Sequence, residues 1–131
     1  MKRLIVDAIV LLAASAFSAA AYGQSAQRIT FKRGASSAVV TGKLYGYNSR
    51  RTFVIRVRKG QTLWTKNAGA NYITVSVKAP PGSTYEQDMA ADCHDRNEVE
   101  PTVSGDYLIT VTECIKADAW HGSFKLLVTV R

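Results

Sequence analysis

The chain of 131 residues carries 17 lysine and arginine residues against 10 aspartate and glutamate residues, a formal net charge of +7, and 47% of its residues are hydrophobic. At this length there is room for one domain with one modest core, and the lack of repeats, low-complexity tracts and linkers excludes a multidomain organisation. A basic exported protein can meet anionic lipid, glycan, nucleic acid or an acidic protein cleft, whereas a solvated basic face is the plainer interpretation.

The chain begins with the pattern of a secretory signal. Two basic residues precede an apolar run over 4–17, which one aspartate interrupts, and small residues follow up to Gly23. This order predicts a signal peptide over 1–23, cleaved after Gly23 or Ala21. The alternative is a membrane anchor, but the apolar run is shorter than a full span. We therefore expect a soluble periplasmic protein without an anchor, in a compartment that disfavours nucleic acid as a partner, with one domain over 24–131.

The mature part shows strand patterns and no convincing helix. Apolar and polar residues alternate in short runs that end at glycine, proline or serine. Lys59 and Gly60 form a two-residue turn, which predicts a hairpin between the runs on either side, and Gly42 predicts a bulge or weak point. The expected strands cover 28–32, 38–44, 52–58, 61–66, 72–77, 107–112 and 123–130.

About seven to eight short strands spaced by turns predict an all-β fold, either an antiparallel β-sandwich or a closed barrel, and we expect the sandwich. The segment 82–101 is polar and acidic without a sustained period. It is long for a structureless loop, so we expect a short strand or a pinned functional loop there, and we expect 86–100 to be solvated. The residues expected in the core are Val54, Val57, Leu63, Val75, Ile109, Val111, Phe124 and Val128.

Two cysteines, Cys93 and Cys114, lie in the mature part. In an oxidising compartment an even pair predicts one disulfide, which would stabilise the domain by roughly 3 kcal/mol in the chain-entropy model. The alternative is a catalytic or metal-bound thiol, which needs a base or further ligands. His94 is adjacent in sequence, but neighbours on a strand point to opposite sides.

Signals for catalysis are weak. The histidines, His94 and His121, stand in no nucleophile, zinc or haem pattern. Asp92, His94, Asp95 and Glu98 are conceivable metal ligands, but the fixed glycine and closing glutamate of a calcium loop are absent. We therefore expect no metal and no cofactor. Since a small sandwich without a site signature is more often a binding module, we also expect that the protein is not an enzyme.

Several short motifs follow one another through the mature chain. They are Phe31-Lys32-Arg33-Gly34, Ser36-Ser37-Ala38, Gly42, Gly46-Tyr47, Arg58-Lys59-Gly60-Gln61 and Ser104-Gly105-Asp106-Tyr107. In order and spacing they resemble the periplasmic inhibitors of g-type (goose-type) lysozyme. The Gly-Gln turn and the Ser-Gly-x-Tyr start also occur in bacterial pre-peptidase C-terminal domains, which share a β-sandwich plan.

The resemblance implies an exported inhibitor that inserts rigid loops into the active-site cleft of a g-type lysozyme and so protects peptidoglycan. Lysozymes cut peptidoglycan with carboxylates in a deep cleft, where donors and aromatic rings from an inhibitor can dock. The positions that match are Tyr47, Ser104 and Gly105. Together with Lys116 and Trp120 they are the expected lysozyme-binding residues, and we expect all five on one continuous edge.

The loop after the Tyr107 strand departs from the family. Family members carry two arginines there, four residues apart, whereas 114–120 reads Cys-Ile-Lys-Ala-Asp-Ala-Trp. Lys116 can supply a point charge but cannot reproduce a bidentate guanidinium. An alternative is therefore a pre-peptidase-type sandwich that binds peptidoglycan, another glycan or an envelope component without inhibiting an enzyme. For either function we expect Trp120 to be exposed, as a sugar platform or interface anchor, and Trp64 to lie in the core.

Overall fold

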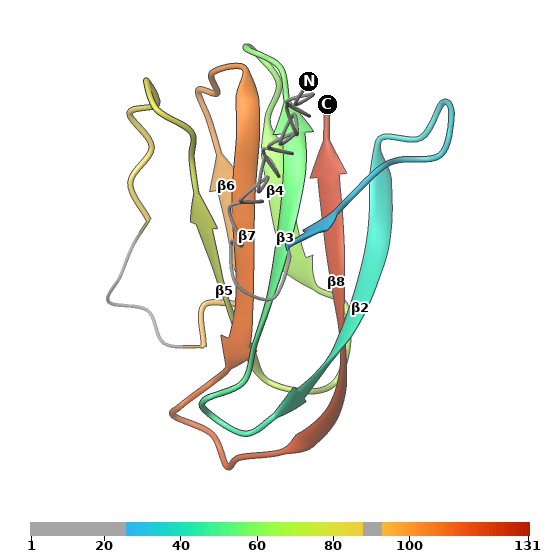
Figure 1. The fold of residues 1–131 in the computed structure, drawn as a ribbon, viewed down its shortest axis with the longest axis vertical. Coiled ribbons are helices and arrows are strands. Elements are labelled where there is room, and N and C mark those ends of the chain that lie inside the picture. Colours follow the sequence, from blue (N-terminus) through green and yellow to red (C-terminus); the bar gives the residue numbers. More distant parts are fainter. Residues whose placement is uncertain (1–25, 88–92) are drawn as a thin grey trace, which may run out of the picture.

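The computed structural model describes residues 26–87 and 93–131, and within these ranges the chain forms eight strands and no helix. The strands form two four-stranded sheets packed face to face (Figure 1). The first sheet has the order β1 (Gln27–Arg28), β3 (Arg50–Val57), β7 (Gly105–Glu113) and β5 (Ile73–Lys78). The second has the order β2 (Ser37–Tyr45), β8 (His121–Val130), β4 (Leu63–Asn67) and β6 (Arg96–Val99).

All strand pairings are antiparallel except that of β1 with β3. The expected all-β fold is therefore confirmed. None of the described residues belongs to a helix that is long and apolar enough to span a bilayer. The expected signal peptide, 1–23, lies outside the described residues.

The core lies between the two sheets and is built from alternate residues of each strand. Ile73, Val75 and Val77 of β5 all point inward, as their spacing predicts. Phe53 and Phe124 meet edge to face from opposite sheets, with ring centroids 6.2 Å apart. The other members of the expected core, except Val54, are buried as well: Val57, Leu63, Ile109, Val111 and Val128.

The expectation that Val54 is buried is wrong. Val54 lies in β3 between Phe53 and Ile55, which are both buried, so the strand pleat turns its side chain to the outer face. Val57 is three residues further on and therefore faces the opposite side.

The predicted hairpin between 52–58 and 61–66 is also wrong, because β3 and β4 belong to different sheets. The turn is formed, with Gly60 at φ +90° and the N–H of Gln61 donating to the carbonyl of Arg58 at 3.0 Å. Beyond it, Thr62 and Arg131 exchange backbone hydrogen bonds of 2.9 and 3.2 Å. These bonds start the pairing of β4 with the last strand, β8, so the turn carries the chain across the sandwich.

Gly42 does not form a bulge, because β2 pairs with β8 without interruption from Ser37 to Tyr45. The glycine instead allows a close approach. A Cβ at this position would lie 2.7 Å from a ring carbon of Phe124, which is nearer than packed carbons can come. The ring of Phe124 therefore packs over the strand where β2 lacks a side chain.

The acidic segment contains a short strand, β6, which confirms the expectation of a short strand within 82–101, while the expectation of a solvated loop is wrong for Arg96–Val99. Asn97 of β6 is buried and donates to Thr65 Oγ1 at 3.1 Å and to the carbonyl of Val75 at 3.0 Å, which joins the two sheets. Its Oδ1 accepts from Gln87 Nε2 at 2.9 Å. Residues 88–92, and with them Asp92, lie outside the described residues.

Arg28 and Asp106 form a bidentate ion pair on the outer face of the first sheet. Arg28 Nη1 and Nη2 donate to Asp106 Oδ1 and Oδ2 at 3.1 and 2.8 Å. The hydrogen bond from Arg28 lowers the pKa of Asp106, and the charges of Arg28 and Arg56 act in the same direction. The charged form of Asp106 is therefore favoured in the folded protein.

This pair predicts a pH-dependent contribution to stability. Because the folded-state pKa of Asp106 is lowered, the contribution is present above the usual aspartate pKa of about 4 and is lost as the pH falls through the folded pKa. The effect is small, since the two side chains are 49% and 44% exposed. We expect the melting temperature of Asp106→Asn to lie slightly below that of the wild type at pH 7, and the two to converge as the pH falls through the lowered pKa of Asp106. A constant difference over this range would contradict the assignment.

Candidate functional site

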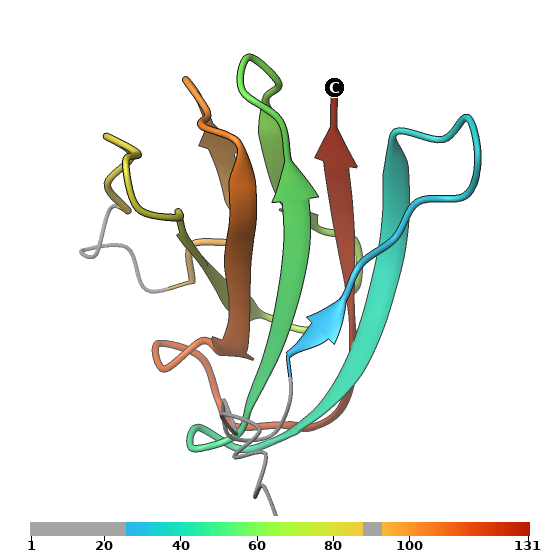
Figure 2. The same cartoon turned by 45° about the horizontal axis from the view of Figure 1, so that its top comes forward.

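Three connections between strands meet at one end of the sandwich. The register places Arg50 opposite Thr112 and Ile73 opposite Glu113, so the turns before β3 and β5 and the loop after β7 open to the same side. The end of β2 also lies here, because Tyr45 pairs with His121. In Figure 1 the β2–β3 and β7–β8 connections lie side by side at the bottom, away from the C-terminus, and Figure 2 shows the same neighbourhood. We call residues 45–49, 68–72 and 114–121 the aromatic end.

Glu113 joins two of these connections from inside. It is the last residue of β7 and follows the inward-facing Ile109 and Val111 at intervals of two, so its side chain is buried and only 1% exposed. One carboxylate oxygen, Oε1, accepts the backbone N–H of Trp120 at 2.7 Å, and the other accepts the N–H of Gly46. A single buried carboxylate thereby fixes the β2–β3 turn against the β7–β8 loop.

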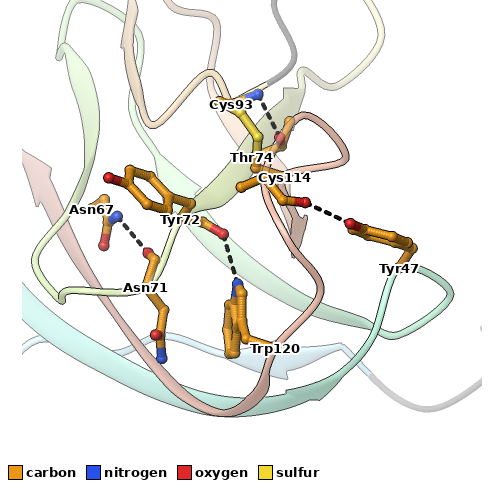
Figure 3. Close-up of a disulfide and its surroundings, with 9 residues drawn as sticks. Tyr47, Asn67, Asn71, Tyr72, Thr74, Cys93, Cys114 and Trp120 are labelled. Atoms are coloured by element: carbon orange, nitrogen blue, oxygen red, sulfur yellow. Dashed lines mark hydrogen bonds between the residues drawn. A yellow bond between two sulfur atoms is a disulfide. The ribbon is translucent and has the colours of Figure 1, made fainter.

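Tyr72 and the disulfide hold the β7–β8 loop on its other side (Figure 3). The carbonyl of Tyr72 accepts the N–H of Cys114 at 3.3 Å and the indole N–H of Trp120 at 3.1 Å. Cys114 is bonded to Cys93, with Cα atoms 4.7 Å apart, so the expected disulfide is confirmed. The N–H of Cys93 donates to Thr74 Oγ1 of β5 at 2.9 Å. Both ends of the loop are thus tied to the segments that precede β5 and β6.

Tyr47 is presented by a tight turn. Gly46 has φ +105°, a conformation that glycine adopts without strain, and its carbonyl accepts the N–H of Ser49 at 3.0 Å. The Tyr47 hydroxyl donates to the carbonyl of Ala117 in the β7–β8 loop, while 45% of the residue surface stays exposed. The ring is therefore held in place and still accessible to a partner.

Exposed apolar side chains gather at the aromatic end. Of the five large hydrophobic residues that are exposed in the described part of the chain, four lie here: Tyr45 at 65%, Tyr47 at 45%, Tyr72 at 67% and Ile115 at 61%. The rings of Tyr45 and His121 lie 6.4 Å apart. Charges are sparse, with one lysine and one aspartate in 45–49, 68–72 and 114–121. A nearly neutral aromatic surface on a chain of net charge +7 is typical of an interaction site.

The structure brings three of the five expected binding residues together. Tyr47, Lys116 and Trp120 lie at the aromatic end, but Ser104 and Gly105 lie at the opposite end of β7. Strand β7 covers nine residues, so roughly 25 Å separates its two ends. The expected continuous edge of all five is therefore wrong.

Ser104 and Gly105 have local structural roles where they lie. Ser104 Oγ accepts the N–H of Lys59 at 2.9 Å and so ties the start of β7 to the β3–β4 turn. Gly105 packs under Pro80, whose Cγ would lie 2.9 Å from a Cβ at this position.

The two tryptophans lie differently from the expectations. Trp120 is partly buried against the core with its indole N–H bonded, so the expectation of an exposed ring is wrong. Trp64 is not a core residue: it lies between the buried Leu63 and Thr65 and faces outward. The guanidinium of Arg131 lies 5.5 Å from the centre of its ring, a cation–π contact that covers one face.

The sequence analysis missed Glu113 and Tyr72. Glu113 had a signal, because a carboxylate continues the inward alternation of β7, and such a residue needs partners when buried. The sequence gives no signal for Tyr72, since the hydrogen bonds to Cys114 and Trp120 are made by its backbone carbonyl. No group of three or more histidine, cysteine, aspartate or glutamate side chains in 26–87 and 93–131 is arranged to hold a metal ion.

Comparison with known proteins gives structural matches only. No protein-family model and no curated protein sequence matches the chain. The crystal structure of PliG from Aeromonas hydrophila, a periplasmic inhibitor of g-type lysozyme, matches with a TM-score of 0.60 and 20% identity over 82% of this chain and 96% of that one. PliG from Salmonella Typhimurium matches with a TM-score of 0.56 and 18% identity over 79% of this chain and 96% of that one.

A mutant of the same inhibitor from Escherichia coli matches with a TM-score of 0.55 and 18% identity, over 82% of this chain and all of that one. The three matches cover nearly the whole length of each inhibitor. The resemblance inferred from the short motifs is thus supported by independent structural evidence. The chain has the fold of the periplasmic inhibitors of g-type lysozyme.

Proposed function

We propose that this protein is an exported, non-enzymatic inhibitor of g-type lysozyme that needs no cofactor and works in the periplasm. The observation that carries the proposal is the gathering of exposed tyrosines on the fixed loops at one end of this fold. Three inhibitors of g-type lysozyme share the fold over nearly their whole length, which supports the same role here. Tyrosines are typical anchors of protein interfaces, because a rigid ring loses little entropy on docking.

In the proposed mechanism the aromatic end enters the substrate cleft of the lysozyme. Glu113, the disulfide and the Tyr72 carbonyl hold the loops before binding, which lowers the entropic cost of association. The rings of Tyr47 and Tyr72 fill sugar subsites. The exposed ammonium of Lys116 pairs with a cleft carboxylate, as a point charge instead of a bidentate guanidinium. Ser104 and Gly105 are not part of this surface.

A lysis assay with g-type, c-type and i-type lysozymes tests the proposal. We expect the purified protein to slow lysis of bacterial cell walls by g-type lysozyme, and to act less on the other two types. If g-type lysozyme stays fully active when this protein is present in micromolar excess over the lysozyme, the inhibitor function is rejected.

Replacing Tyr47 tests the proposed surface. We expect Tyr47→Ala to weaken inhibition by about 1–3 kcal/mol, as the loss of an interface anchor does, with little change in stability. Tyr47→Phe keeps the ring and loses only the hydroxyl bond to Ala117, so it should retain most of the inhibition. Inhibition constants and melting temperatures for both variants decide the matter. Equal inhibition by Tyr47→Ala and the wild type would place the binding surface elsewhere.

A glycan-binding function without inhibition is the second candidate. Two features favour it. The segment 114–120 contains no arginine, and the neighbouring exposed aromatic rings are of a kind that also stacks on sugars. Sedimentation with insoluble peptidoglycan separates the two functions. A glycan-binding protein would co-sediment without added lysozyme and leave every lysozyme active.

A further inference from the structure

Strand β2 forms a long free edge of the second sheet. The N–H of Val130 donates to the carbonyl of Ser36 at 2.8 Å. This bond fixes the phase of the ladder, so that the even-numbered residues of β2 bond to β8. The odd-numbered residues direct their N–H and C=O groups away from the sheet. They are Ser37, Val39, Thr41, Lys43 and Tyr45, and no other described segment forms a backbone hydrogen bond with them.

The other three edges are short or covered. Strand β1 has two residues and β6 has four. The outer side of β5 is bonded: the N–H of Val75 donates to the carbonyl of His94 and that of Val77 to Gln87 Oε1, both at 2.8 Å. Proteins usually blunt their free edges in this way to prevent pairing with other chains. Strand β2 is nine residues long, lacks proline and carries a single charge, so among the described edge strands it is the longest one open to a partner.

The side chains along this edge are matched to a second copy of the chain. Val39, 55% exposed, and Tyr45, 65% exposed, lie three residues on either side of Gly42. If two β2 strands pair antiparallel about a two-fold axis at Gly42, each valine faces the other copy's tyrosine. Aromatic and β-branched side chains form favourable cross-strand pairs. Lys43, the only charge, then faces Thr41 of the other copy.

We propose that two copies of this protein associate through their β2 strands in this register and form one continuous eight-stranded sheet. The residues whose backbone groups bond across this pairing are odd-numbered, and these groups are free in the single copy. Edge pairing alone buries little surface, so the dimer is weak and depends on concentration. The net charge of +7 opposes it at low ionic strength, and salt relieves this repulsion. Tyr45 belongs both to this edge and to the aromatic end, but the dimer forms without any partner at the aromatic end.

Sedimentation equilibrium of the purified protein tests the proposal. We expect the average mass to rise from one towards two copies with increasing concentration, and to do so at lower concentration in high salt. Val39→Lys sets a second lysine near Lys43 of the other copy, and Thr41→Pro removes an outward N–H without touching the ladder to β8. Both variants should stay monomeric and folded, whereas the control Thr41→Ser should dimerise like the wild type.

A wild-type mass of one copy up to the limit of solubility would overturn the proposal. So would dimerisation of folded Val39→Lys at wild-type strength, because the association would then use another surface. If Thr41→Pro fails to fold, Val39→Lys decides alone, since its side chain is on the outer face and the melting temperature verifies the fold.

Discussion

Replacement of Glu113 by alanine is expected to lower the free energy of unfolding by about 2–4 kcal/mol. The change leaves the N–H groups of Gly46 and Trp120 without their acceptor, and each unsatisfied donor costs about 1–3 kcal/mol when it stays buried. Because both N–H groups are partly exposed to water, the expected loss of stability lies below the sum of the two largest costs. Glu113→Gln retains one acceptor oxygen but turns an NH2 group towards an N–H donor, so an intermediate loss is expected.

Urea unfolding measures these differences. The matched control is Glu98→Ala, because Glu98 also lies on a strand but its side chain is exposed, and a change below about 0.5 kcal/mol is expected there. In the lysozyme assay, Glu113→Ala should also inhibit less than the wild type at temperatures where it is fully folded, since its loops are no longer fixed. A Glu113→Ala protein as stable as Glu98→Ala would show that the buried carboxylate does not hold the loops.

Removal of the disulfide is expected to have an effect of similar size. Residues Cys93 and Cys114 are 21 positions apart, and opening a loop of this length costs roughly 3 kcal/mol in the chain-entropy model. In a domain of this size the melting temperature should fall by roughly 10 °C. The double variant Cys93→Ala/Cys114→Ala and the reduced wild type should agree in melting temperature, which separates the loss of the bond from the presence of the reductant.

Thiol titration is the direct check on the disulfide. Native protein should contain no reactive sulfhydryl, since both cysteines of the described chain are bonded. Two reactive thiols in folded, unreduced protein would contradict the structure at this position.

Alternation along single strands made most of the fold predictable. The period of two in 72–77 and 123–130 gave the inward faces of β5 and β8, because a half-buried strand needs apolar residues on one side only. The same period of two places Val54 and Val57, which are three residues apart, on opposite faces of β3, so the two could not both be core residues. The β3–β4 hairpin was inferred from a local turn signal, but the partner of β4 is β8 at the far end of the chain. Pairing over such a distance leaves no local trace in the sequence.

The candidate site was only partly predictable, for a related reason. Motif matches identified Tyr47 and Ser104 as relevant positions. They could not show that the two residues lie at opposite ends of the sandwich, separated by the length of β7. Tyr72 contributes through its backbone carbonyl, which the sequence does not encode by residue type. Glu113 could have been found, since a carboxylate at an inward position requires hydrogen-bond donors, and turns supply them.

The pairing of Tyr45 with His121 and the exposed ring of Tyr72 extend the candidate surface beyond the family motif. With one lysine and one aspartate, this surface carries no net charge. Its binding should therefore depend less on salt than that of an inhibitor that uses arginines, because few exposed charge pairs are screened.

Steady-state kinetics of g-type lysozyme, with and without this protein, test the central claim most directly. If the aromatic end occupies the substrate cleft, the inhibitor competes with the glycan, so KM for a soluble substrate rises with inhibitor concentration while kcat stays constant. Tyr47→Ala should then need about 5- to 150-fold more protein for the same rise in KM, the equivalent of 1–3 kcal/mol. An unchanged KM at every concentration of the protein, or a fall in kcat at constant KM, would contradict occupation of the cleft.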